Sequence, residues 1–189
     1  IWVIFITFIA LMLVYTFGRT LWTPVYVRLV GGKTVGDVVK DIGPEARTYW
    51  QPIMNKAGLK YPPEELTLIA FKQEQQLEVW SATDDGRSVK LTQFPILSQS
   101  GTLGPKRREH DRQIPEGIYR VPDLNPNSAF HLSIKVDYPN EWDREHANPE
   151  DKKHLGGDIF THGGSASIGC IALGDPTIEK LFTLIAETG

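Results

Sequence analysis

The chain has 189 residues, of which 41% are hydrophobic and 23% are charged. This length and composition suit one domain with a buried core plus appendages, and the formal net charge of −3 gives no indication of a nucleic-acid-binding protein. The chain contains a single cysteine and five histidines, which excludes a disulfide within it. One cysteine and scattered histidines also lack the spacing of a metal site, so we expect no metal and no cofactor.

The first stretch of the chain predicts a membrane anchor. Residues 1–17 are almost continuously apolar, and no charge appears before Arg19. A helix of this length reaches roughly 26 Å, which approaches the hydrocarbon thickness of a bilayer. We therefore predict that residues 1–22 form an N-terminal transmembrane or signal-anchor helix that attaches the protein to a membrane. The alternatives are a buried core helix and a cleaved signal peptide, although Phe17-Gly18-Arg19 offers no small-residue cleavage site.

Residues 23–60 are predicted to be a linker followed by an amphipathic helix. Within the linker, residues 25–29 alternate like a short strand, and residues 35–42 are compatible with a short helix before Gly43-Pro44. Residues 44–57 place apolar side chains at three- and four-residue spacing, and Gly58 supplies a stop.

The remaining part, residues 61–189, shows mostly strand patterns. The predicted strands are 66–71, 76–82, 89–94, 117–121 and 130–136, with a hairpin signal at Asp84-Asp85-Gly86. The Pro- and Asn-rich segment between the last two strands is interpreted as a loop. Residues 138–157 are polar and lack a helix or strand period, which is typical of lids and binding loops. Residues 176–187 predict a closing helix with Asp175 as its cap. The fold class is therefore α+β, mainly β with α appendages.

The most informative stretch is residues 160–173, in which Cys170 follows His162 by eight residues. The residues between them are almost all Gly, Ser and Ala, and apolar residues flank the stretch on both sides. This pattern predicts a strand, a tight loop of small residues and a second strand. A lone cysteine is usually a small buried residue and a lone histidine a satisfied polar one. Their coincidence across a Gly-rich loop favours an imidazole base facing a thiol nucleophile.

His162-Gly163 followed by Ser167-Ile168-Gly169-Cys170 resembles the HG…SxGC signature of the YkuD-type L,D-transpeptidases, and more narrowly their YafK-like branch. The similarity runs from about Tyr49 to the end of the chain. Ala172 departs from it, because most of the family has Arg two positions after the cysteine. Further similar stretches are Tyr61-Pro62-Pro63-Glu64-Glu65-Leu66, Gly104-Pro105-Lys106, Pro115-Glu116-Gly117-Ile118-Tyr119, Asn125-Pro126-Asn127-Ser128 and Tyr138-Pro139-Asn140. The resemblance implies that residues 61–189 form a catalytic domain with a mixed β-sandwich fold, truncated at its C-terminus.

The resemblance also implies the catalytic residues. Cys170 would be the nucleophile and His162 its base, and we expect the imidazole to lower the pKa of the thiol. The backbone amides of Gly169 and Cys170 would stabilise the oxyanion, and Ser167 would shape the loop through side-chain hydrogen bonds. Because the loop contains no acid, we expect a backbone carbonyl to orient His162, with Asp158 as the weaker alternative.

The resemblance implies a peptidoglycan stem peptide as the substrate, with a peptidoglycan-linked protein as the alternative, and a location in the cell envelope outside the cytoplasm. The predicted substrate-binding residues are Gly163, Gly164, His131, Tyr138 and Lys106. Three functions stay open: an L,D-transpeptidase, an amidase or endopeptidase that hydrolyses peptidoglycan or protein–peptidoglycan links, and a non-catalytic peptidoglycan-binding module.

Overall fold

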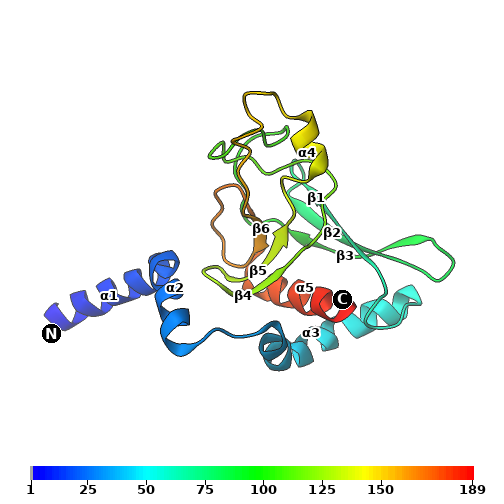
Figure 1. Cartoon of the computed structure of the whole chain (residues 1–189). Helices are drawn as coiled ribbons and strands as arrows, with labels where there is room; N and C mark the ends of the chain where they lie inside the picture. The colour runs from blue at the N-terminus through cyan, green and yellow to red at the C-terminus, as the bar shows by residue number, and fades with distance from the viewer. Residues whose placement is uncertain (1) are drawn as a thin grey trace.

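The computed structural model describes residues 2–189 and contains five helices and seven strands in that range (Figure 1). The helices are α1 (Trp2–Phe17), α2 (Arg19–Val30), α3 (Val35–Ala57), α4 (Glu141–His146) and α5 (Asp175–Thr188). The strands are β1 (Leu66–Phe71), β2 (Gln76–Ala82), β3 (Ser88–Pro95), β4 (Leu124–Ser128), β5 (His131–Val136), β6 (Ile159–His162) and β7 (Ile171–Ala172). The predicted α+β class is confirmed, but the helices hold more residues than the strands, so "mainly β" is wrong.

The apolar N-terminal stretch is divided between two helices. α1 ends at Phe17, α2 begins at Arg19, and the two helices run in different directions on one side of the molecule (Figure 1). Glycine at position 18 has low helix propensity and separates them. α1 spans 16 residues, about 24 Å, and none of the helices within residues 2–189 is both long enough and apolar enough to cross a membrane. The predicted membrane anchor over residues 1–22 is therefore not supported, and residues 25–29 are helical rather than extended.

α3 replaces the two separate helices predicted between residues 35 and 57. It begins with a capping box in which Thr34 and Asp37 exchange hydrogen bonds, and it ends at Gly58 in the left-handed conformation. Pro44 lies inside it rather than at its start. A proline removes one backbone hydrogen bond, and the buried stripe that includes Trp50 and Met54 compensates for this loss by tertiary packing.

β1, β2 and β3 form a three-stranded antiparallel sheet in that order. The predicted strands 66–71 and 76–82 coincide with β1 and β2, and β3 is one residue longer at each end than predicted. The alternation of apolar and polar residues and the polar turns between the strands were therefore sufficient to predict these three strands from the sequence.

The second sheet has the order β4-β5-β6-β7, in which only β6 and β7 pair in parallel. β4 contains Pro126 and corresponds to the segment that was interpreted as a loop. An edge strand tolerates a proline because one side of its backbone needs no partner. The predicted strand 117–121 is wrong, since this segment lies outside the seven strands and Ile118 is 95% exposed.

α3 and α5 lie side by side and pack against the sheets (Figure 1). The two helices share a core with β2, β5 and the residues that follow the loop 163–170. Trp50 lies at its centre, fully buried, and its Nε1 donates to the carbonyl of Lys180 in α5 at 2.9 Å. The largest fully buried side chains are Trp50, Phe182, Met54, Leu77, Ile134, Leu173, Ile178, Leu181, Leu184, Val79 and Thr183.

Candidate active site

The predicted strand, loop and strand around the cysteine are present. β6 ends at His162, β7 begins at Ile171, and Thr161 and His162 pair with Ile171 and Ala172. Because the strands are parallel, the loop of small residues between them runs back along β6, so that β7 starts beside Thr161. The Cys170 Sγ lies 4.0 Å from the backbone carbonyl oxygen of Asp158, which directly precedes β6. The register places Cys170 beside Phe160, two residues before His162 on β6.

The His162 ring is held from two directions. Its Nδ1 lies 2.5 Å from the carbonyl oxygen of Gly163, and because a carbonyl only accepts, Nδ1 carries the hydrogen and Nε2 is the basic nitrogen. The ring of Phe130 stacks on it at a centroid distance of 4.5 Å and an angle of 26°. The expected orientation by a backbone carbonyl is confirmed. The Asp158 alternative is wrong, because that carboxylate is 85% exposed and lies near Lys135.

Both reacting groups are shifted toward their neutral forms. Burial lowers the pKa of His162, and the Gly163 hydrogen bond opposes this only in part. Burial also raises the pKa of the half-buried Cys170 thiol, outweighing the Phe160 amide that lowers it, and the Asp158 charge raises it further. The expected low pKa of the thiol is therefore wrong for the resting site. The arrangement suits an imidazole that removes the thiol proton during attack rather than a preformed ion pair.

The loop amides expected to stabilise an oxyanion already have partners. The N–H of Gly169 donates to Ser100 Oγ at 2.5 Å, and the N–H of Cys170 donates to Ser167 Oγ at 3.1 Å. The Ser167 hydroxyl in turn donates to the Cys170 carbonyl, which confirms that Ser167 shapes the loop. These hydroxyls fix the direction of both amides, and a substrate oxyanion would have to replace them.

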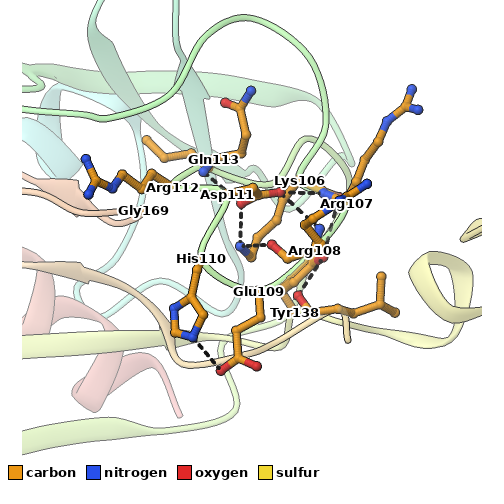
Figure 2. A network of polar contacts seen from close by, with 12 residues as sticks. Lys106, Arg107, Arg108, Glu109, His110, Asp111, Arg112, Gln113, Tyr138 and Gly169 are labelled. Atoms are coloured by element: carbon orange, nitrogen blue, oxygen red, sulfur yellow. Dashed lines mark hydrogen bonds and ion pairs between the residues drawn. The ribbon is translucent and has the colours of Figure 1, made fainter. Parts of the chain in front are cut away.

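A clamp formed by residues 106–113 supports this loop from outside (Figure 2). Asp111 Oδ1 accepts from Lys106 Nζ at 2.7 Å and from the Gln113 amide at 3.0 Å, and Oδ2 accepts from the Arg107 and Arg108 amides. Burial alone would raise the pKa of Asp111, but these donors lower it to about 2. We refer to this arrangement as the Asp111 clamp.

Lys106 and Tyr138 belong to the support of the site rather than to its surface. The Lys106 side chain is 5% exposed, and its ammonium donates to Asp111 and to the Arg108 carbonyl. Tyr138 is 4% exposed, and its hydroxyl lies within hydrogen-bonding distance of the carbonyls of Lys106 and Leu155. Both polar groups already have partners within the protein, and the expectation that these residues contact substrate stays a prediction.

The other predicted substrate-binding residues lie on the His162 side of the site. His131 Nε2 lies 2.6 Å from Glu179 Oε1 of α5, so the ring has a partner within the protein. Both side chains are partly exposed. The Gly164 amide donates to Asp175 Oδ1 at 2.7 Å, which means that Asp175 ties the loop to α5; the helix cap itself is Gly174. A Cβ at Gly163 would lie 2.6 Å from the Phe130 carbonyl oxygen, so only glycine fits there.

A cavity of about 280 Å³ borders the site between the two sheets. Phe160 and Ile171, the residues beside and after Cys170, contribute to its wall. Its other walls come from β1, β2, β5, the segment 114–121 and Lys72, and the polar side chains among them include Lys72 and Glu116. Ala172 is fully buried and bonds through its backbone to Ser98, so position 172 faces the interior.

Several residues around the site were not found from the sequence. Ser100, Asp111 and Phe130 lie 70, 59 and 40 positions before Cys170, and no local pattern joins them to it. Asp111 stands in a run of mixed charge over residues 106–112, and such a run is more typical of a solvated face than of a site.

Comparisons with known proteins agree with this geometry. The family model YkuD, described as the L,D-transpeptidase catalytic domain, matches residues 66–188. Over 117 residues, 61% of this chain, the sequence is 32% identical to "Putative L,D-transpeptidase YafK" of Escherichia coli strain K12, and it matches the protein of that name in Escherichia coli O157:H7 equally well. The matched region spans 45% of the length of each of these relatives.

Proposed function

The chain belongs to the YkuD family of L,D-transpeptidase catalytic domains, and from this premise we propose that it is a cysteine-dependent acyl transferase acting on peptidoglycan stem peptides outside the cytoplasm. The observation that supports this most directly is the state of the His162 ring. Its Nδ1 hydrogen is committed to the Gly163 carbonyl, so Nε2 is left as the proton acceptor beside the loop that carries Cys170.

In the first step, Nε2 of His162 takes the thiol proton while Cys170 Sγ attacks a peptide carbonyl of the stem. The Sγ–C bond forms, the tetrahedral intermediate collapses, and the C–N bond breaks. The leaving amine receives the proton from His162, and a thioester remains on Cys170. The neutral resting state of both groups is consistent with a proton that moves only as the nucleophile attacks.

In the second step, an acceptor amine attacks the thioester carbonyl and gives its proton to His162. The C–N bond forms, the C–Sγ bond breaks, and the thiol is restored by return of the proton. The amides of Gly169 and Cys170 would stabilise the oxyanion in both steps after exchanging their bonds to Ser100 and Ser167 for the substrate oxygen. The two serine hydroxyls hold these N–H groups in a fixed direction before the substrate binds, so the backbone does not have to rearrange when the oxyanion forms.

One observation favours hydrolysis as a second candidate function. The tip of the catalytic loop lies open to solvent, with Ile168 80% exposed and Ser165 and Ala166 also exposed. Water that reaches the thioester would release a carboxylic acid, and the chain would then act as an amidase or endopeptidase on peptidoglycan or on protein–peptidoglycan links. A binding module without catalysis would need neither the oriented imidazole nor the thiol.

The test is to incubate purified stem-peptide fragments of murein with the protein and to identify the products by mass spectrometry. Cys170→Ala serves as the control, with its fold checked by circular dichroism. Crosslinked products support transfer, shortened products support hydrolysis, and unchanged fragments with both proteins would contradict an enzymatic function on these peptides.

A further inference from the structure

The backbone of Arg112 lies directly against the residue that precedes the candidate nucleophile. A Cβ placed on Gly169 would be 3.9 Å from both the Cα and the carbonyl carbon of Arg112. The Ser100 hydroxyl bridges the two residues, because it accepts from the Gly169 amide at 2.5 Å and donates to the Arg112 carbonyl at 2.8 Å. Arg112 is therefore fixed to the catalytic loop although it is distant from it in sequence.

The backbone of Arg112 is held in an unfavourable conformation. Its φ is +57°, in the left-handed region that an arginine rarely adopts. The neighbours on both sides impose it: the Asp111 carboxylate is fixed by the clamp, and the Gln113 amide donates to that same carboxylate. Local strain that surrounding structure maintains is found preferentially at ligand-binding and catalytic positions.

The guanidinium of Arg112 extends to the side of the loop on which Gly169 lies, away from Arg107 and Arg108 (Figure 2). The residue is exposed, and within residues 2–189 its guanidinium has no hydrogen bond or ion pair. The nearby Lys106 ammonium, in contrast, is neutralised by Asp111 and is buried. Within the described part of the chain, Arg112 therefore has an unpaired, exposed positive charge at the edge of the Cys170 loop, where an anionic ligand could bind it.

We propose that Arg112 binds a free carboxylate of the peptide that acylates Cys170 and so selects anionic donors. A guanidinium presents a planar pair of N–H donors that matches a carboxylate, and its charge makes these hydrogen bonds strong. The fixed backbone reduces the freedom lost on binding. This inference rests on the proposed function for the identity of the donor, but the effect of the Arg112 charge on reactions at the thiol can be tested without it.

The first test compares two alkylating reagents of similar size, anionic iodoacetate and neutral iodoacetamide, on the single thiol of the protein. Arg112 should favour the anionic reagent, so Arg112→Asn should lower the iodoacetate-to-iodoacetamide rate ratio by about 3- to 10-fold at low salt. Asparagine tolerates the left-handed backbone, so this variant should fold. Arg112→Lys should keep most of the ratio, and Arg107→Asn, on the other side of the clamp, should leave it unchanged. An unchanged ratio in Arg112→Asn would overturn the proposal.

The second test measures turnover of a donor peptide whose free carboxylate is present or replaced by a carboxamide. Wild-type protein should prefer the carboxylate in kcat/KM, mainly through KM, and Arg112→Asn should lose about 10- to 100-fold on the carboxylate but little on the carboxamide. Equal losses on both donors would overturn the assignment. If the wild type turns over neither donor, the proposed function fails, while the alkylation ratio still decides the position of the charge.

Discussion

The Asp111 clamp gives a stability prediction whose size follows from its contacts. Asp111→Asn removes the charge that accompanies Lys106, whose side chain is 5% exposed, and leaves a buried ammonium unpaired. Breaking a buried ion pair on one side costs about 3 to 5 kcal/mol. Lowering the pKa of Asp111 from 3.8 to about 2 corresponds to about 2 to 3 kcal/mol. We therefore expect the free energy of unfolding to fall by about 3 kcal/mol and Tm to fall by roughly 6 to 12 °C.

The assay is urea unfolding followed by fluorescence, with Asp41→Asn as the matched control. Asp41 pairs with Lys33 at 2.9 Å, but both side chains are more than half exposed, so its loss should cost less than about 1 kcal/mol. The direction in which stability changes with pH also follows from the pKa of Asp111. The pKa of Asp111 is lower in the folded chain than in the unfolded one, so its contribution is complete above about pH 4 and disappears as the pH falls toward 2. Two variants of equal stability at pH 7 would refute the buried clamp.

Three further predictions concern the catalytic loop. His162→Gln should slow acylation of Cys170 by about 10²- to 10⁴-fold, measured by single-turnover kinetics, while the pKa of the thiol found by iodoacetamide labelling stays above that of a free cysteine in both proteins. Phe130→Ala should uncover the imidazole, so the pKa of His162, followed by NMR titration, and the acid limb of the pH–rate profile should both move upward. Gly163→Ala should lower Tm and activity together, because its Cβ would lie 2.5 Å from Asp175 Oδ1; a variant as stable as wild type would show that the loop can relax.

The sequence allowed prediction of the parts of the fold that depend on local pattern. β1 and β2 follow alternating apolar residues, and the closing helix α5 extends only one residue beyond its predicted limit at each end. Hydropathy of the apolar N-terminal run did not reveal that it is divided between two helices at Gly18. α4 was missed because it spans six residues, too few for a period, although its capping box of Asn140 and Asp143 was a usable signal.

The candidate site was predictable only where its residues are neighbours in the chain. His162, Ser167 and Cys170 lie within nine positions, so their loop could be recognised from composition and spacing. Ser100 reaches the loop through its hydrogen bond with Gly169, a tertiary contact that a single sequence does not encode locally. The direction of the thiol pKa was mispredicted for a similar reason, since it depends on burial in the folded chain.

The central claim is that Cys170 carries the acyl group, and intact-protein mass spectrometry after acid quenching tests it most directly. Incubation with a stem-peptide donor and no acceptor should add the mass of the acyl fragment to the wild-type protein. Peptide mapping should place this mass on Cys170, and Cys170→Ala should show neither the adduct nor turnover. An adduct on another residue, or turnover of the donor by Cys170→Ala, would contradict the account.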